Sequence, residues 1–240
     1  TINYGLFPFA AITGIVCGLI VLQPALSTAI LIALISFTLF FVAGADLKQV
    51  LVAGVVAMVI LVGLMMVLDH ASQRINDYMA AFRDPLQASY QVEQALAALA
   101  NGGYLGVGLG KGDQKFGPLP LAHTDGVFAI VGEEMGLLGS IGVVILLAFL
   151  AWRGFRVATR ARDTYGFLLA VGVTAWISYQ ALINIAVITA VIPFTGMPMP
   201  FLSYGGSSMT TTVVGIGILL SVSRDAAQGR QPTRRQPKSG

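Results

Sequence analysis

The sequence has few charged residues and a single cysteine. Lys, Arg, Asp and Glu make up only 10% of the 240 residues, whereas an average soluble domain has about 25%. This scarcity excludes an ordinary soluble fold. The one cysteine, Cys17, lies inside an apolar run, so an intrachain disulfide and a cysteine-based metal cluster are both excluded. We expect Cys17 to be a small packing residue.

Charge is missing altogether from three long stretches, 1–45, 49–68 and 164–223. About 20 apolar residues are enough for a helix to cross a bilayer. Because the runs are continuous rather than alternating, and because backbone in lipid must satisfy its own hydrogen bonds, a helix bundle is favoured over a β-barrel. The sequence therefore predicts an all-α polytopic membrane protein. Six transmembrane helices are expected, at about 6–22, 25–44, 49–68, 127–151, 165–191 and 207–222.

The placement of basic residues predicts the orientation of these helices. Ten of the 14 basic residues lie at Lys48, in a cluster at 153–162 and in the tail at 224–238, and the positive-inside rule assigns all three places to the cytoplasm. The long segment 69–125 is then an outer loop, and a shorter outer loop lies around 192–206. The expected domains are a membrane domain at 1–224 and a disordered, basic cytoplasmic tail at 225–240.

A glycine-rich run occupies residues 102–112 of the long outer loop, after an amphipathic stretch that ends near Ala100. Taken alone, the run resembles a phosphate cradle. However, no strand precedes it, and the Walker spacing to Lys and Ser or Thr is missing. A nucleotide site is therefore excluded and no nucleic-acid partner is expected. A flexible surface loop is the structural alternative.

Several motifs occur in an order typical of one known family. They are Leu22-Gln23-Pro24, the outer loop that ends in His123-Thr124-Asp125, the pair Glu133-Glu134, the residues 180–185 and the run Pro193-Phe194-Thr195-Gly196-Met197-Pro198-Met199-Pro200-Phe201-Leu202-Ser203-Tyr204-Gly205-Gly206-Ser207-Ser208. Together they resemble the shape, elongation, division and sporulation (SEDS) family of FtsW and RodA. The resemblance covers nearly the whole chain, and residues 108–110, 114–115 and 132–134 look more like the FtsW branch.

Members of this family usually have about ten spans, each of the usual transmembrane length. Six spans therefore suggest that the chain is the C-terminal part of a SEDS-type domain and that N-terminal spans are missing. Gly5 to Arg224 is the part that fits the family's order of motifs.

The resemblance implies a peptidoglycan glycosyltransferase that polymerises lipid II at the outer face of the bacterial cytoplasmic (inner) membrane during division or elongation. The implied partners are lipid II, a class B penicillin-binding protein and membrane proteins of the divisome or elongasome. A lipid II flippase and a non-catalytic scaffold for the penicillin-binding protein stay open as alternatives. Ionisable residues gather at the outer face instead of lining the bundle, which favours the polymerase over the flippase.

Asp125 is the expected catalytic residue. In the implied reaction, a sugar hydroxyl attacks the anomeric carbon of a donor and a lipid diphosphate leaves, so the site needs a base and groups that neutralise the diphosphate. Asp125 matches the family's essential aspartate and precedes the fourth span. It is expected to act as the general base or to hold a divalent cation, Mg²⁺ or Mn²⁺, as the only cofactor. Capping of the fourth helix by Thr124 or Asp125 is the structural alternative and is compatible with catalysis.

Basic residues of the outer loop are candidates for binding the diphosphate. Lys115 is the first choice because Gln114-Lys115 matches the family, and Lys111 and Arg83 are further candidates. An exposed, solvated lysine is the alternative for Lys115. His123 is expected to orient Asp125.

Two further pairs complete the predicted substrate site. Glu133 lies eight positions beyond Asp125, about 80° around a helix, so we expect it to share a cavity with Asp125, whereas Glu134 points nearly opposite. Pairing of either with polar groups between helices is the alternative. Ser207 and Ser208 open the sixth span and are expected to cap it beside N–H groups that could meet an anion; packing near Asp125 is the alternative.

The chain departs from the family pattern at several positions, and one departure removes a carboxylate from the second span. These substitutions favour the scaffold, whereas the intact Asp125 favours the enzyme. The positions are Ala25, Ser27, Gln87, Ser89, Leu121 and Gly126.

Overall fold

The computed structural model describes residues 5–23, 25–83, 89–117 and 123–228, and within them the fold is all-helical, as predicted. The helices α3, α6, α7 and α8 are long and apolar enough to cross a membrane. The helices α1 and α2 are apolar but shorter, with 16 and 17 residues. The protein is therefore a multi-pass membrane protein, and the number of six spans stays a prediction. The six helices are α1 (Leu6–Val21), α2 (Leu26–Val42), α3 (Leu47–Val67), α6 (Val127–Ala158), α7 (Thr164–Ile188) and α8 (Gly206–Gln228).

Two helices run further than their apolar residues predict. Helix α6 continues past residue 151 to Ala158, and α8 continues past residue 222 to Gln228, into the first residues of the predicted tail. Arginine and alanine are both good helix formers, and an arginine side chain can leave the helix surface for water, so the charges do not end the helix. Residues 229–240 of the predicted tail lie outside the described residues.

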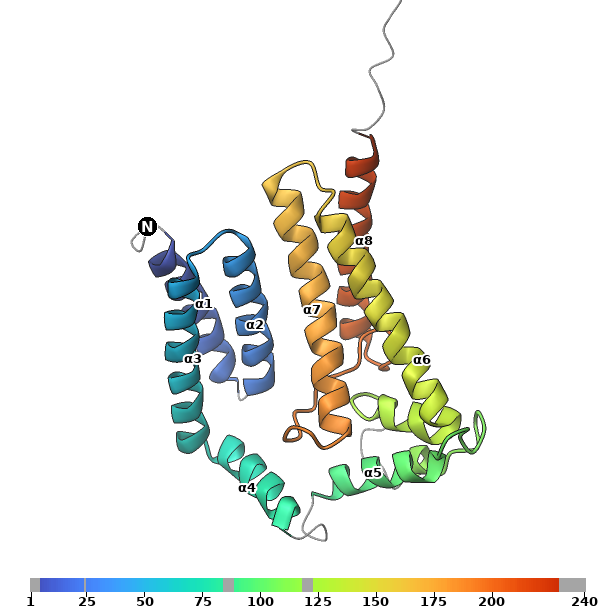
Figure 1. Ribbon diagram of the computed structural model, residues 1–240. Helices are drawn as coiled ribbons and strands as arrows, with labels where there is room; N and C mark the ends of the chain where they lie inside the picture. Colours follow the sequence, from blue (N-terminus) through green and yellow to red (C-terminus); the bar gives the residue numbers. More distant parts are fainter. Residues whose placement is uncertain (1–4, 24, 84–88, 118–122, 229–240) are drawn as a thin grey trace, which may run out of the picture.

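The helix directions alternate along the chain and bring the basic residues to one end. The turn between α2 and α3, the turn between α6 and α7, and the last residue of α8 all lie at the same end of the molecule (Figure 1). Asp46 and Asp163 cap α3 and α7 there, by accepting hydrogen bonds from the backbone N–H groups of Lys48 and Gly166. We call this the basic end, defined by Lys48 and the arginines at 153–162, and the opposite end the loop end.

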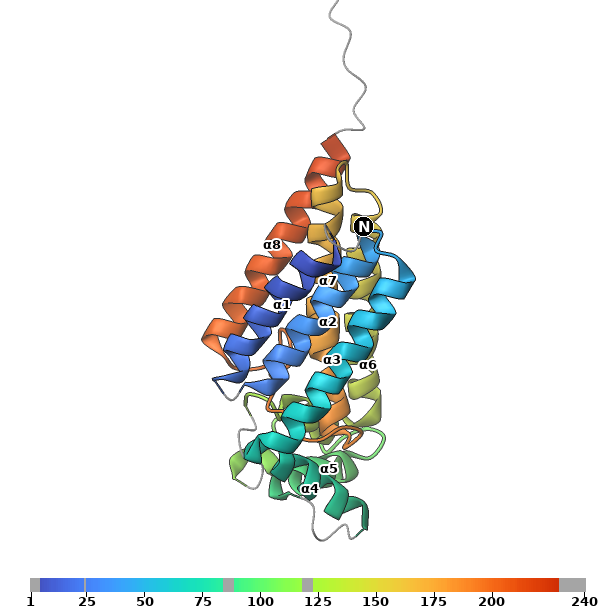
Figure 2. The same ribbon diagram turned by 90° about the vertical axis from the view of Figure 1, so that its left-hand side faces the viewer.

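The segment predicted as an outer loop contains two helices, α4 (Asp69–Arg83) and α5 (Tyr90–Gly102), and the short 3₁₀ helix η2 (Gln114–Phe116). The sequence predicted only an amphipathic stretch within α5. Both helices lie at the loop end, at an angle to the long helices (Figures 1 and 2). They form a layer at this end of the bundle, in which α5 contributes Ala95 and Ala98 to the apolar core.

Helix α7 lies at the centre of the packing, in contact with α2, α6 and α8. Near the basic end its buried face, including Ala170 and Ile177, packs with Ala158 of α6 and Leu219 of α8. Near the loop end, Ile188 packs with α5 and the start of α6. In contrast, α1 and α3 have no buried residues. Their exposed apolar side chains are suited to lipid or to another membrane helix.

Candidate functional site

Asp125 lies in a turn directly before α6 and is 5% exposed. Gly126 occupies the N-cap position of the helix and Val127 is its first residue. The capping predicted for Thr124 or Asp125 is therefore replaced by a turn in which Asp125 precedes the cap. Within this turn the Thr124 hydroxyl donates a hydrogen bond to Oδ1 of Asp125 over 3.1 Å.

The backbone of Asp125 is held by a buried amide of α7. Nδ2 of Asn184 donates to the carbonyl oxygen of Asp125 at 2.8 Å and to that of Met197 at 2.7 Å. One helical turn earlier, Nε2 of Gln180 donates to the carbonyl oxygen of Pro198 at 2.9 Å. Two amides on one face of α7 thus fasten the turn at 123–125 and the 193–205 loop to the same helix.

The 193–205 loop also binds the turn directly. The Ser203 hydroxyl donates to the carbonyl oxygen of Thr124 and accepts from the N–H of Met199 at 2.6 Å. The N–H of Tyr204 donates to the carbonyl oxygen of His123 at 2.7 Å. The fold therefore brings the 193–205 loop directly against the motif that contains Asp125.

A glycine keeps the space beside the carboxylate open. Gly196 has φ +66°, which favours glycine, and a Cβ there would lie 3.6 Å from Oδ2 of Asp125. The neighbouring Thr195 carbonyl accepts a hydrogen bond from the Ser27 hydroxyl at 3.1 Å, which ties the start of α2 to the site. Among the described residues, Oγ1 of Thr195 and Oδ1 of Asn184 are buried without a hydrogen-bond partner. Unpaired buried polar atoms are uncommon and often mark functional positions.

Burial raises the pKa of Asp125 above the ordinary value of 3.8. The N–H groups of Asp125 and Gly126, the Thr124 hydroxyl and the charge of His123 all act in the opposite direction but do not overcome this desolvation. A carboxylate with a raised pKa is a stronger proton acceptor, which suits a general base.

Helix α6 breaks at Gly136, where φ is 66° and ψ is −164°. Only glycine readily adopts this conformation. The break separates a short first part, 127–135, from the long part, 137–158, that runs to the basic end (Figure 1). Glu133 and Glu134 therefore precede the long apolar part at the loop end, whereas the sequence places them inside one straight span.

The two glutamates hold the glycine-rich loop. Glu133 is 2% exposed, and its carboxylate accepts hydrogen bonds from the N–H groups of Asp113 at 3.2 Å and Gln114 at 3.3 Å. The Glu134 carboxylate accepts from the N–H of Gly110 at 2.9 Å and forms an ion pair with Nζ of Lys115 at 2.5 Å. The pairing resembles the predicted alternative, except that the polar partners belong to the outer loop instead of a second helix. The hydrogen bonds of Glu133 do not include Asp125, with which the sequence predicted a shared cavity.

Backbone contacts make the glycine-rich loop an ordered element. The break in α6 frees the carbonyls of Glu133 and Glu134, which accept from Val107 and Gly108 at 3.0 Å each. A Cβ at Gly106 would overlap the Glu134 backbone, so only glycine allows this approach. The flexible loop that the sequence predicts as an alternative is thus replaced by a fixed one. The N–H groups of Gly106, Val107, Gly108, Gly110 and Lys111 donate to oxygens of the protein itself.

The two described lysines among the predicted diphosphate ligands differ in their surroundings. Lys115 is bound to Glu134 and lies 5.0 Å from the centre of the Phe116 ring, whereas Lys111 is exposed. Arg83 ends α4, and its side chain lies outside the described residues. None of these contacts reaches Asp125.

His123 precedes the site in the same turn, and the two serines follow the 193–205 loop in the sequence. His123 is exposed, and its ring meets the Tyr204 ring edge to face at 6.3 Å. Ser207 and Ser208 lie in the first turn of α8, and their carbonyls accept hydrogen bonds from the Thr211 hydroxyl. The 193–205 loop thus links both serines to the turn that carries Asp125.

Several residues that build the site have no role predicted from the sequence. Gln180 and Asn184 are the clearest examples, because two amides four positions apart in an otherwise apolar helix share one face and need polar partners. Ser203, Thr195 and Gly196 belong to a recognised motif, but their individual roles depend on how the loop folds.

The donor set around Asp125 limits how a metal ion could bind. Across the described ranges, no three residues among His, Cys, Asp and Glu gather in a metal-binding group. Asp125 can therefore offer one carboxylate. This donor set fits an ion held mainly by substrate phosphates and water, as Mg²⁺ often is, and does not fit an all-protein cage.

Comparison with known proteins agrees with the pattern of motifs. A family model for FtsW, RodA and SpoVE, described as cell cycle protein, matches residues 2–228. Stage V sporulation protein E of Bacillus subtilis is 41% identical over 86% of this chain and 56% of its own length. A probable peptidoglycan glycosyltransferase FtsW of Geobacter sulfurreducens is 36% identical over 91% of this chain and 59% of its own length. The chain therefore spans less than two thirds of either relative.

Two solved structures share the fold. A peptidoglycan synthase complex that coordinates polymerization and crosslinking contains a chain with a TM-score of 0.72 and 30% identity, over 92% of this chain and 62% of that one. The rod shape determining protein RodA of Thermus thermophilus has a TM-score of 0.61 and 28% identity, over 93% of this chain and 57% of its own.

Proposed function

The chain belongs to the FtsW, RodA and SpoVE family of cell cycle proteins, and we propose that it polymerises lipid II into glycan strands as a peptidoglycan glycosyltransferase. The observation that carries the proposal is the buried Asp125, whose turn is held through backbone carbonyls by Asn184 of α7 and Ser203 of the 193–205 loop, which leaves the carboxylate available. The relatives named as probable peptidoglycan glycosyltransferases support the same activity. The proposed setting is the bacterial inner membrane, with the basic end and the C-terminus in the cytoplasm and the loop end outside.

Asp125 acts as the general base in the proposed reaction. Its carboxylate accepts the proton of the acceptor sugar hydroxyl while that oxygen forms a bond to the anomeric carbon of the donor. The bond from the anomeric carbon to the diphosphate oxygen breaks, and the lipid diphosphate leaves with the electron pair. The raised pKa of Asp125 supports this role. Asn184 acts as a positioning residue, because it fixes the Asp125 backbone without using the carboxylate.

The leaving diphosphate needs positive charge at the loop end. Lys111 is exposed, so its side chain can turn toward a ligand at the surface. Lys115 could bind the diphosphate only if its ion pair with Glu134 breaks or if the two side chains move together. Arg83, His123, Glu133, Ser207 and Ser208 stay proposed substrate-binding residues. As the alternative to its role as the base, Asp125 would be the protein ligand of a Mg²⁺ or Mn²⁺ ion, which would neutralise developing charge on the diphosphate.

A class B penicillin-binding protein is the proposed partner. The apolar side chains of α1 and α3 are exposed on helices that have no buried residues, which leaves lipid-facing surface for a partner helix. The similarity to a chain of a peptidoglycan synthase complex supports such an assembly. Membrane proteins of the divisome or elongasome are further proposed partners.

Polymerisation by the purified full chain tests the proposed activity. The chain is supplied with lipid II and Mg²⁺, with and without a class B penicillin-binding protein, and glycan strands are separated on gels. Strands are expected with Mg²⁺, and their loss on chelation would support the cation. Transfer of labelled lipid II across vesicles without strands would indicate a flippase. Stable co-purification with the partner and neither activity would indicate a scaffold.

A further inference from the structure

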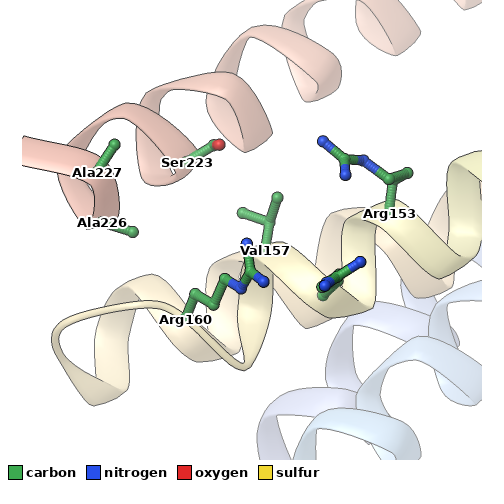
Figure 3. Close-up of a pocket in the computed structure, with 7 residues that line it drawn as sticks. Arg153, Val157, Arg160, Ser223, Ala226 and Ala227 are labelled. Atoms are coloured by element: carbon green, nitrogen blue, oxygen red, sulfur yellow. The ribbon is translucent and has the colours of Figure 1, made fainter.

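A cavity of about 120 Å³ lies at the basic end of the molecule, between the last turns of α6 and α8 (Figure 3). Asp125 lies at the loop end, so this cavity is separate from the proposed catalytic site. Three arginines line the cavity together with Ser223 and three apolar side chains, one of which is Ala227. The residues that matter are Arg153, Arg156, Arg160, Val157, Ser223 and Ala226.

The charges of these arginines are not balanced by the carboxylates at the same end. Asp46 caps α3, Asp163 caps α7, and Asp225 accepts a hydrogen bond from Arg162 at 3.4 Å. The sequence from 226 to 240 contains no Asp or Glu. Positive charges that share a small space repel each other, so an anion from outside the chain would stabilise the cluster.

The geometry goes beyond what membrane orientation requires. The positive-inside rule and the helix dipole both favour arginines at the end of α6, but neither depends on which face of the helix carries them. Here the side chains of Arg153 and Arg160 reach into the space between α6 and α8 (Figure 3). The guanidinium of Arg156 lies 5.2 Å from the centre of the Trp152 ring, a cation–π contact.

We propose that this cavity binds the headgroup of an anionic glycerophospholipid. Guanidinium groups pair with phosphate oxygens through two parallel hydrogen bonds, and the Ser223 hydroxyl can donate another. The cavity lies at the ends of two helices that are long enough to cross the membrane, where lipid headgroups lie. Its apolar wall, from Val157 and Ala226, suits the glycerol and first acyl carbons. Free phosphate would leave that wall empty, and basic cavities between membrane helices commonly bind lipid headgroups.

Binding of phosphatidylglycerol to the purified full chain in detergent tests this proposal by native mass spectrometry. Phosphatidylglycerol is expected to bind more tightly than phosphatidylcholine. The double variant Arg153→Gln/Arg160→Gln should bind phosphatidylglycerol at least about tenfold more weakly than the unmodified chain, because charge-assisted hydrogen bonds are lost. Ser223→Phe keeps every arginine but fills the cavity, so it should weaken binding even if charge removal disturbs insertion.

The matched control is Lys48→Gln/Arg224→Gln, which removes the same charge from two likewise exposed residues at the same end that do not line the cavity. It should bind phosphatidylglycerol like the unmodified chain. Equal weakening by this control, or unchanged binding in both cavity variants, would overturn the proposal. Competition with inorganic phosphate distinguishes a lipid site from a free-anion site. If millimolar phosphate displaces phosphatidylglycerol completely, the cavity binds free anions and the lipid assignment is wrong. This test reads lipid binding alone and is independent of glycan synthesis.

Discussion

Asn184 is the residue on which the position of Asp125 depends most. It is 1% exposed and donates to two carbonyl oxygens, one on each of the segments that meet at the site. Asn184→Leu would leave both carbonyls buried without a partner, so we expect a loss of about 2 to 4 kcal/mol in stability. Gln180→Leu frees one carbonyl and should cost about half as much. Thermal unfolding of both variants in detergent measures the difference, and equal melting temperatures for all three proteins would contradict it.

The pKa of Asp125 predicts the pH dependence of the proposed reaction. The base must be ionised, so the polymerisation rate should rise with pH, through an apparent pKa above 3.8. Because the pKa of Asp125 is higher in the folded state than in the unfolded state, ionisation of Asp125 destabilises the fold at higher pH. This destabilisation decreases as the pH falls through the folded-state pKa and is gone below the unfolded-state value. A pH profile of kcat/KM for the purified chain checks the acid limb. A limb at or below the ordinary aspartate value would contradict the assignment.

Motif order located Asp125, but it did not reveal which atoms hold it. Asp125 is preceded by two residues of a recognised pattern, so its place before α6 could be predicted from the sequence. The link from Asn184 could not, because it joins residues far apart in the chain and depends on the fold of the 193–205 loop. Lys115 shows the same limit, since its pairing with Glu134 follows from the break in α6.

The break in α6 is the least predictable feature among the helices. Apolar runs predict the helix positions to within a few residues at most ends, because a membrane span is long and strongly apolar. Gly136, in contrast, lies in a helix that contains several other glycines. Its unusual conformation is set by the glycine-rich loop, which packs against it through backbone atoms. Only the assembled fold determines which glycine breaks the helix.

Substitution of Gly136 tests this account of α6. Gly136→Ala puts a residue with a side chain at a positive φ angle, and the new Cβ would overlap the backbone of residues 104–106. The substitution should therefore destabilise the protein by about 1 to 3 kcal/mol. Gly142→Ala is the matched control, because it lies in the same helix with nothing within 4 Å of a new Cβ, and it should be neutral or stabilising. Melting temperatures of the two variants in detergent provide the comparison. If Gly136→Ala were as stable as Gly142→Ala, the break would not be needed.

The distribution of charge predicted how the whole molecule is arranged. The segments that carry most of the basic residues are far apart in sequence, yet the structure brings the α2–α3 turn, the α6–α7 turn and the end of α8 to one end (Figure 1). The packing of α2 on α7 and the layer formed by α4 and α5 could not be predicted this way, because they depend on side-chain fit between distant segments.

Labelling of single cysteines tests the orientation of the molecule. With Cys17 replaced by alanine, a cysteine at Tyr104 should react with an impermeant thiol reagent added to intact cells, because this residue is 78% exposed at the loop end. A cysteine at Thr159, exposed at the basic end, should react only after the membrane is opened. The reverse pattern would show that the basic end faces outward.

The most direct test of the proposed function is glycan synthesis by Asp125→Asn. The purified full chain and the variant are supplied with lipid II, Mg²⁺ and the class B partner, and strands are quantified on gels beside thermal melting. The substitution keeps the size of the side chain and an oxygen for the Thr124 hydroxyl but removes the charge, so melting should be nearly unchanged. Strand formation should fall about a hundredfold or more, as expected for loss of a general base. Near-normal strands from the variant would contradict the catalytic role of Asp125.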